Sequence, residues 1–408
     1  MVSLRRGLLY VVLFGLALSI CSNIFEVNRQ LWGNSPLPEV PNARASLEST
    51  KTCCFKGIRC DPDDSYNIFV IQSERKDGRL KLMYAPITQS LVTGLQSREE
   101  ECGYTTIKVL PETKSDIFKY PVMPRSGDVI IYVGTLNSTT FMNRCRTQMI
   151  PNRTYCIWYQ VEPREWPNAS LSPLEDSVCE VWEYTRGNTP KAPLVRYVPP
   201  GFLPTEADET TNDQLVMRRA QSMNPATLQW YFIGRLGPIR QKCWDKLQSL
   251  KYFRKHELKK IPQGGAKGYP KVYTMEDWRN LGRNLKNVIF LNIHQACNRD
   301  QPLETKPLET VRLAQLLSLG FTVISEEANS LDSELYKDIV LVEKDIFHEK
   351  KWSPSLVRLL QNKSALVEWQ LSAYHLFKQL FRPSKLLHDA HVWDGGMLMQ
   401  SSCQTSLN

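Results

Sequence analysis

NVIFLNIHQACNRDQPLETKPLETVRLAQLLSLGFTVISEE, residues 287–327, is the stretch that decides the fold. It begins with the apolar run VIFLNI (288–293), which has the length and composition of a buried strand. The segment LETVRLAQLLSLG then carries apolar residues at helical spacing and ends at Gly320, after which comes a second β-branched run, FTVIS (321–325). Strand, polar loop, helix and strand predict a βαβ unit, in which the two strands are parallel.

Similar strand-like runs recur along most of the chain. The 408 residues suffice for two domains, and strands that alternate with helices predict mostly parallel sheets. We therefore expect an α/β protein with two Rossmann-like domains that face a cleft. The other runs are YNIFVI (66–71), DVIIYVG (128–134), YCIWYQV (155–161), CEVWEYT (179–185), LVRYVP (194–199), LQWYFIG (228–234) and DIVLVE (338–343).

The boundary between the two domains is marked by a change in composition. A Pro-Pro-Gly turn at 199–201 and the acidic, threonine-rich TEADETTND (205–213) interrupt the alternating pattern. This predicts an N-terminal domain at 65–204, a linker at 205–227, a C-terminal domain at 228–362, and a final helix and tail at 363–408.

The N-terminus differs from the rest of the chain. Arg5 and Arg6 precede an uncharged apolar run at 7–25, which is long enough to span a bilayer core of about 30 Å. The positive-inside rule predicts a cytoplasmic tail at 1–6, a type II anchor at 7–25, a stem at 26–64 and a luminal body. The Golgi or endoplasmic reticulum membrane is the expected location. The alternative is a signal peptide cleaved after Cys21.

Cysteines and sequons agree with a luminal body. The chain has 11 cysteines, so disulfides are expected in an oxidising lumen, although the sequence does not reveal which cysteines pair. The alternative for several of them, notably Cys156 in an apolar strand, is a buried thiol. Glycosylation sequons occur at Asn137, Asn152, Asn168 and Asn362.

Several other patterns indicate no site. The basic run KYFRKHELKK (251–260) is interrupted by apolar residues and is typical of a solvated helix, so we expect no nucleic acid partner. Asp61-Pro-Asp63 follows no apolar strand and is interpreted as a turn. His388 and His391 lack a third ligand, so we expect no metal site there.

The helix that follows the polar loop begins with a candidate for ribose binding. Glu309 and Arg312 are three residues apart and share a helix face, with Glu309 in the first turn. A carboxylate at such a position can accept hydrogen bonds from ribose hydroxyls. The alternative is an ion pair between Glu309 and Arg312, and Glu304 offers the same chemistry earlier in the duplicated PLETKPLET (302–310).

A second candidate is FIGRLGPIRQK (232–242), where a strand ends at Gly234 and a helix starts near Pro238. That geometry directs backbone N–H groups at an anion, and Arg235, Arg240 and Lys242 add charge for a diphosphate. The alternative is an ordinary βα turn with solvated basic residues.

Three strand ends carry groups that suit proton transfer. In parallel sheets ligands bind at the carboxyl ends of the strands. His294 follows strand 288–293, Glu162 follows strand 155–161, and Glu326 ends strand 321–325. We predict these three as catalytic residues; the alternatives are a structural histidine and solvated acids.

Taken in order, these segments resemble the polysaccharide-type group of GT-B glycosyltransferases, with their L-N-x-H…L-E-x-x-R…S-E run. The motifs here are LNIH, LETVRLAQLLSLG and TVISE. The segments YQVEP (159–163), VWEYTRGN (181–188), VRYVPPGF (195–202) and FIGRLGPIRQK are also similar, so that the match covers residues 128–343. The duplicated PLET loop with Cys297 departs from the family pattern.

The resemblance implies transfer of a hexosyl or pentosyl group from a nucleotide-sugar to an acceptor hydroxyl of a glycan, lipid or protein, without metal or cofactor. It implies that Gly234, Arg235, Arg240, His294, Glu309 and Arg312 bind the donor, and it favours Glu309 over Glu304 for the ribose. It also implies that helix 365–381 packs back onto the first domain. Two alternatives stay open: a luminal sulfotransferase that uses FIGRLGPIRQK as its phosphosulfate loop, and a non-catalytic sugar-binding protein.

Overall fold

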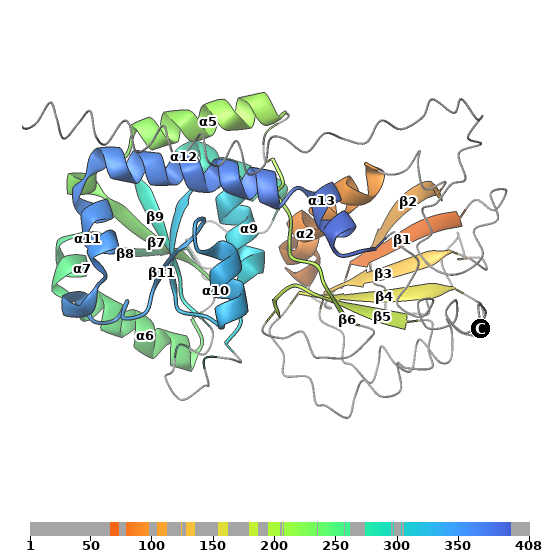
Figure 1. Cartoon of the computed structure of the whole chain (residues 1–408), viewed down its shortest axis with the longest axis horizontal. Coiled ribbons are helices and arrows are strands. Elements are labelled where there is room, and N and C mark those ends of the chain that lie inside the picture. The colour runs from red at the N-terminus through yellow and green to blue at the C-terminus, as the bar shows by residue number, and fades with distance from the viewer. Residues whose placement is uncertain are drawn as a thin grey trace, which may run out of the picture. The chain divides into compact units, whose positions relative to one another are not determined.

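The computed structural model describes residues 66–72, 79–97, 104–111, 124, 128–134, 154–161, 179–186, 195–204, 206, 208–234, 236–256, 258–261, 274–294, 297, 303 and 306–392 (Figure 1). Within these ranges, no helix combines the length and the apolar character needed to cross a membrane. Several sequence-based predictions lie outside the described residues: the tail, anchor and stem, Asp61, Asp63, Asn137, Asn152, Glu162, Asn168, Arg235 and Glu304.

The first lobe is built on a sheet in which every pair of neighbouring strands is parallel. The strand order is β2-β1-β3-β4-β5-β6. Helix α2 (Arg79–Gln96) connects β1 to β2 and packs against both. The strands are β1 (Tyr66–Gln72), β2 (Tyr104–Pro111), β3 (Val129–Val133), β4 (Tyr155–Gln160), β5 (Cys179–Glu183) and β6 (Val195–Tyr197).

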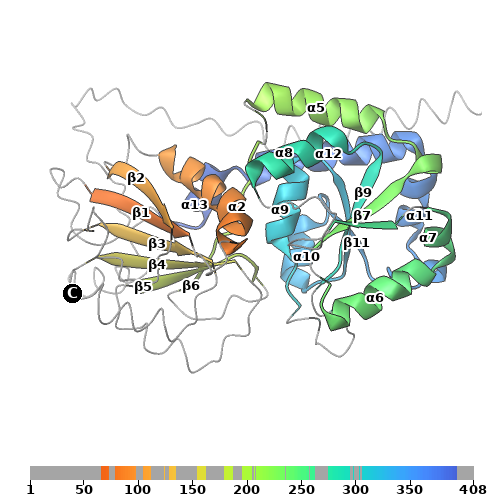
Figure 2. The same ribbon diagram turned by 180° about the vertical axis from the view of Figure 1, so that it is seen from behind.

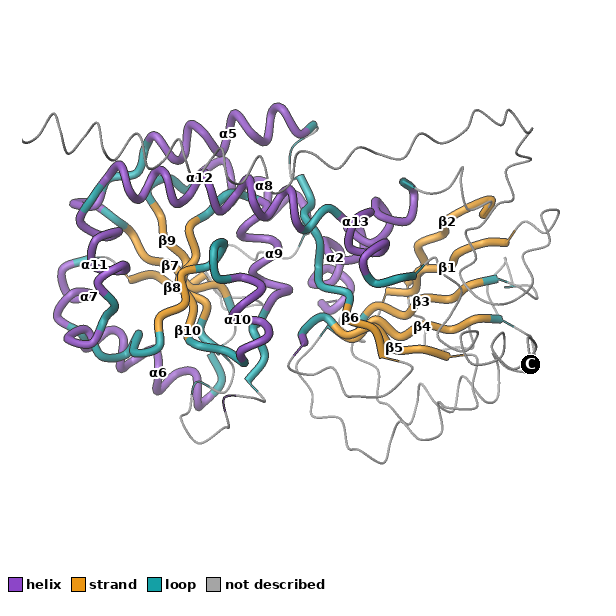
Figure 3. Tube along the Cα trace, viewed as in Figure 1, coloured by secondary structure: helices purple, strands orange, loops and turns teal. Residues whose placement is uncertain are grey.

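The second lobe also contains a wholly parallel sheet, with the order β11-β10-β9-β7-β8. Helices lie on both sides of this sheet (Figures 1 and 3). Its strands are β7 (Gln229–Ile233), β8 (Leu258–Ile261), β9 (Val288–Asn292), β10 (Thr322–Glu326) and β11 (Leu341–Glu343). Its helices are α5 (Glu209–Gln221), η6 (Pro225–Thr227), α6 (Pro238–Ser249), α7 (Lys251–Lys255), α8 (Met275–Asn284), α9 (Thr310–Ser318), α10 (Ser330–Tyr336), η8 (Glu349–Lys351), α11 (Pro354–Gln361) and α12 (Lys363–Leu380).

The order of the second sheet creates a topological switch point. The chain passes from β7 to β8 on one side, then returns across β7 and continues on the other side through β9, β10 and β11. The connection that follows β7 therefore runs to one side of the sheet, and the connection that follows β9 runs to the other side. In open parallel sheets this separation forms a crevice at the carboxyl ends of the two strands, where ligands bind.

The βαβ unit predicted from residues 287–327 is confirmed as β9, α9 and β10, with β9 and β10 paired in parallel. Gly320 ends its helix with a φ of +67°. The Gly320 amide donates to the carbonyl of Leu317 at 2.9 Å, and the Phe321 amide donates to that of Leu316 at 3.0 Å. These two bonds form a Schellman motif, which directs the chain into β10.

The segment between the domains is not an extended linker along its whole length, because residues 209–221 form α5. Its Asn212 amide donates to the Tyr374 hydroxyl of α12 at 2.8 Å, and its Asp213 pairs with Lys378 of α12 at 2.8 Å. These contacts attach α5 to the helical layer of the second lobe. Figure 2 shows α5 and α12 running along the same side of the second sheet.

Helix 365–381 was predicted to pack back onto the first domain, and α12 contacts that domain at Phe202, whose ring lies 5.9 Å from that of Tyr374 and 6.4 Å from that of Phe377. Tyr374 and Phe377 also belong to the apolar core of the second lobe, where α12 packs against α9 and β10. The short helix α13 (Pro383–Asp389) follows and packs against α2 of the first lobe. Arg196 of β6 holds the end of this segment by donating to the carbonyls of Ala390 and His391, each at 2.9 Å.

The two lobes also share hydrogen bonds at Asp332 of α10. The Thr185 hydroxyl and the Arg186 amide of the first lobe donate to its carboxylate, the latter at 2.9 Å. The Leu308 amide, which precedes α9, donates to the same carboxylate at 3.1 Å. One buried acid thus satisfies backbone and side-chain donors from both lobes, as buried charges require.

Gly320→Ala should lower the free energy of unfolding by about 2–4 kcal/mol. An alanine there has an unfavourable positive φ, and its Cβ would lie 2.5 Å from Cγ1 of Val216. Urea denaturation followed by tryptophan fluorescence measures the loss. Gly237→Ala is the matched control, because a Cβ at Gly237 meets no atom within 4 Å; it should change stability by no more than about 1 kcal/mol. Equal losses in the two variants would contradict the role assigned to Gly320.

Candidate functional site

The carboxyl end of β7 is shaped by glycine. Gly234 has a φ of +153°, a conformation that residues with a side chain rarely adopt, and a Cβ there would lie 2.8 Å from Cζ of Phe232. After Gly234 the chain reaches Gly237, the N-cap of α6, which forms no side-chain capping bond. The positive end of the α6 dipole is therefore located beside the switch point.

Two buried arginines share one carboxylate at this edge. Arg240 comes from the first turn of α6, whereas Arg312 and Glu309 come from the start of α9. One oxygen of Glu309 accepts from Arg240 and the other accepts from Arg312. The side chains of Arg240, Arg312 and Glu309 are only 8%, 9% and 11% exposed. The ion pair between Glu309 and Arg312 that the sequence offered as an alternative is therefore present.

Further contacts hold the two guanidinium groups in place. Arg240 Nε donates to the His294 carbonyl at 3.2 Å, and Arg312 Nη1 donates to Asn292 Oδ1 at 3.1 Å. Both guanidinium groups also lie over the Phe232 ring, 5.5 Å and 5.0 Å from its centroid. Both guanidinium groups therefore bond to Glu309 in surroundings of low dielectric constant, where charge acts strongly.

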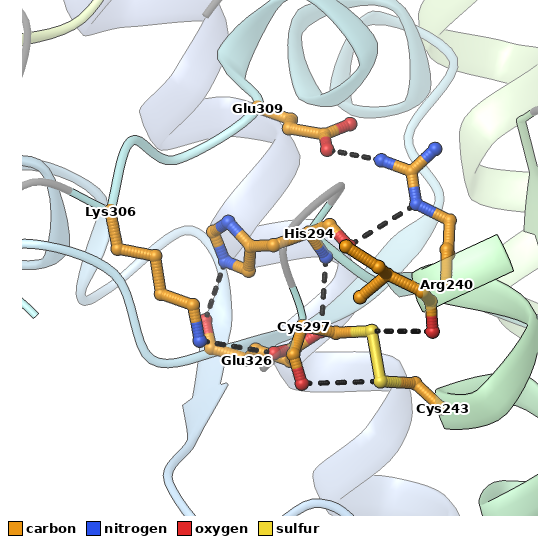
Figure 4. The surroundings of a disulfide bond; sticks show 8 residues. Arg240, Cys243, His294, Cys297, Lys306, Glu309 and Glu326 are labelled. Atoms are coloured by element: carbon orange, nitrogen blue, oxygen red, sulfur yellow. Dashed lines mark hydrogen bonds and ion pairs between the residues drawn. A yellow bond between two sulfur atoms is a disulfide. The ribbon is translucent and has the colours of Figure 1, made fainter. Parts of the chain in front are cut away.

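His294 and Glu326 lie next to each other at the ends of β9 and β10 (Figure 4). The His294 amide donates to Glu326 Oε1 at 3.0 Å, and His294 Nε2 lies 3.4 Å from the Glu326 carbonyl. Lys306 Nζ pairs with the other carboxylate oxygen of Glu326 at 3.4 Å. His294 is 2% exposed and Glu326 4%. The bond from the His294 amide to the Glu326 carboxylate holds the turn after β9, so Glu326 has a positioning role.

A disulfide joins α6 to the loop after β9. It links Cys243 to Cys297, which are 54 residues apart in sequence and 6.4 Å apart between their Cα atoms. The expectation of disulfides is thus confirmed for this pair. Cys156, in contrast, is a buried thiol outside any disulfide, as its position in an apolar strand suggested.

Most of the residues predicted for donor binding and catalysis come together at this edge of the second sheet. Gly234, Arg240, His294, Glu309, Arg312 and Glu326 lie at the carboxyl ends of β7, β9 and β10 or at the helix starts beside them. The sequence analysis missed Phe232, Lys306 and the pairing of Cys243 with Cys297. One signal for the pairing was available: each cysteine follows a predicted site residue, Arg240 or His294, by three positions.

The carboxyl edge of the first sheet carries buried polar side chains. Gln72, Gln160 and Glu183 end β1, β4 and β5, and they are 6%, 0% and 0% exposed. Burial, and then the nearby Glu183 carboxylate, raise the pKa of the Tyr159 phenol above its ordinary value. This edge therefore offers neutral hydrogen-bonding groups and a carboxylate.

Two further predictions concern sites elsewhere. Asn362, a predicted glycosylation site, is exposed and serves as the N-cap of α12, where its Oδ1 accepts from the Ala365 amide at 3.1 Å. Within the part of the chain that the structure describes, no group of three or more histidine, cysteine or acidic residues is placed to hold a metal ion.

Neither a family model nor a curated protein matches this chain. Among solved structures, it is similar to an α1,3-fucosyltransferase, with a TM-score of 0.43 and 12% identity over 83% of this chain and 92% of that one. It is also similar to Alr3699/HepE of Anabaena in complex with UDP and glucose, with a TM-score of 0.38 and 10% identity over 84% of this chain and 99% of that one. TM-scores this low establish neither family nor activity.

Glu309→Gln should lower the free energy of unfolding by about 3–5 kcal/mol, because it leaves two buried guanidinium groups without their shared charge. Glu276→Gln is the matched control. Glu276 pairs with Arg279 at the same i,i+3 spacing, but these side chains are 56% and 31% exposed, so the loss should stay within about 1 kcal/mol. Urea denaturation measures both. A loss for Glu309→Gln as small as that of the control would show that the arginines do not depend on this carboxylate.

Proposed function

We propose that this chain is a GT-B-type glycosyltransferase that moves a sugar from a nucleotide-sugar to an acceptor hydroxyl. The observation that carries the proposal is the buried cluster of Arg240, Arg312 and Glu309 at the switch point between β7 and β9. A switch point is where open parallel sheets bind nucleotides, and guanidinium groups recognise phosphate through bidentate hydrogen bonds.

The donor diphosphate would bind at the start of α6. There the helix dipole and the backbone N–H groups of the first turn favour an anion, and Arg240 lies in that turn. Arg312 approaches the same place, since its Nη2 would be 3.4 Å from a Cβ at Gly234. In this proposal Arg235, Arg240 and Arg312 offset the charge that develops on the leaving diphosphate, so that no metal is needed.

The ribose of the donor would contact Glu309. A carboxylate has about four lone-pair sites, so Glu309 can accept hydroxyl hydrogens while it keeps both arginines. Binding the ribose and holding the arginines are compatible roles. We propose that His294 lies near the diphosphate, where its ring can donate to a phosphate oxygen or transfer a proton.

The acceptor would bind to the first lobe. Glu162 follows β4 in sequence and is the residue that we propose as the base for the acceptor hydroxyl, with Glu326 as the alternative. The acceptor is proposed to be a glycan, a lipid-linked glycan or a glycoprotein.

The proposed location is the Golgi or endoplasmic reticulum membrane, with residues 7–25 as a type II anchor and the catalytic region in the lumen. The apolar run behind Arg5 and Arg6, the cysteine content and the sequons support this proposal. The Cys243–Cys297 disulfide agrees with an oxidising compartment.

A panel of nucleotides and nucleotide-sugars tests the function with the purified full-length chain. Calorimetry should detect binding of UDP or GDP without added metal, and one nucleotide-sugar should release nucleotide when an acceptor is added. Arg240→Gln should weaken this binding at least tenfold, or about 1.4 kcal/mol, whereas Arg279→Gln on the exposed face of α8 should leave it unchanged.

Other outcomes of the panel identify other functions. Preference for adenosine 3′,5′-bisphosphate over UDP and GDP would identify a sulfotransferase. Nucleotide binding without release or transfer across all donors and acceptors would identify a non-catalytic sugar-binding protein. Failure to bind any of these nucleotides would reject the proposal.

Glu309→Ala should weaken nucleotide affinity about tenfold, because it removes the acceptor for the ribose hydroxyls and releases both arginines. Glu304→Ala is the control from the duplicated PLET segment and should stay within about twofold of wild type. Both are measured by calorimetry below the unfolding temperature of each variant. Equal and small losses of affinity would remove the ribose assignment from Glu309.

A further inference from the structure

We infer that the Cys243–Cys297 disulfide is a positioning element of the nucleotide site, because it holds together the two sides of the switch-point crevice. This inference rests on the proposed function of that site. It assigns a role in ligand binding to a bond whose sulfur atoms need not touch the ligand.

The two cysteines lie on the two segments that meet at the switch point. Cys243 lies in α6, one turn after Arg240, so the two share a face of that helix. Cys297 lies in the loop after β9, three residues after His294. The bond therefore joins the segment that carries a diphosphate-binding arginine to the segment that carries the histidine (Figure 4).

The disulfide ties Cys297 to α6. His294, Cys297 and residues 306–308 lie in irregular backbone, without the ladder hydrogen bonds of a strand. Arg240 Nε donates to the His294 carbonyl at 3.2 Å, so the same two segments are also joined by a hydrogen bond. The covalent bond limits how far these two segments can separate.

The bond also fits closely against the start of α6. Cys297 is 7% exposed, and its sulfur lies 3.6 Å from the carbonyl oxygen of Ile239, the residue before Arg240. Displacement of the loop would therefore disturb the first turn of α6, where the diphosphate is proposed to bind. Holding binding groups in place before the ligand arrives increases affinity, since less ordering entropy is lost on binding.

The test compares two variants of the full-length chain. Cys243→Ala with Cys297→Ala removes the bond without leaving a reactive thiol. Gly320→Ala is the control, because it destabilises the same lobe at the amino end of β10, away from the carboxyl ends of the strands where the nucleotide is proposed to bind. Unfolding by urea and affinity for UDP and GDP are measured for both variants and for wild type.

The double variant should bind the nucleotide about tenfold more weakly than wild type. Gly320→Ala should bind within about twofold of wild type although it too is less stable. Equal affinities of the double variant and wild type would overturn the inference and leave the proposed function intact. Absence of nucleotide binding by wild type would overturn both.

If the double variant does not fold, stepwise reduction of wild type replaces it. Mass spectrometry follows the peptide pair that contains Cys243 and Cys297, and calorimetry follows nucleotide affinity at each step. If nucleotide affinity falls as the disulfide-linked peptide pair disappears, the positioning role is supported. Affinity that persists after the pair is reduced overturns it.

Discussion

The shared carboxylate of Glu309 is the constraint on which the carboxyl edge of the second lobe's sheet depends. Two guanidinium groups can be buried only if their charge is compensated and their N–H groups are bonded. Arg240 belongs to α6 and Arg312 to α9, so one carboxylate fixes the start of two helices against each other. The glycine at 234 and the aromatic ring of Phe232 then provide the space and the surface that the arginines occupy.

The sequence predicted elements well where apolar periodicity was strong. β7, β9 and β10 are almost wholly buried, and continuous apolar runs of strand length identify them. β8 was not recognised, because its LKKI lies in a basic run that was interpreted as helix. The 18-residue helix α2 was also missed, and it contains Pro86, which argues against a helix interior. Periodicity identifies the apolar face of α12 but not the surface that covers it, so its packing against α9 and β10 was not predicted.

The position of polar residues at the strand ends was predicted better than their pairing partners. Polar residues that follow apolar strands lie together because the carboxyl ends of parallel strands meet at one edge, so the positions of His294 and Glu326 followed from local pattern. The pairings of Glu309 with Arg240 and of Cys243 with Cys297 required knowledge that β7 neighbours β9. The order of strands in the sheet decides which strands are neighbours, and the local sequence of a strand does not reveal that order.

The return of α13 to α2 has a consequence for how the chain is made. Leu387 and Val392 belong to the same apolar core as Ile68 and Val70, residues synthesised more than 300 positions earlier. During translation the first lobe emerges long before the segment that closes its core, and such long-range contacts slow folding. The core of the first lobe therefore remains incomplete on the ribosome until almost the whole chain has been produced.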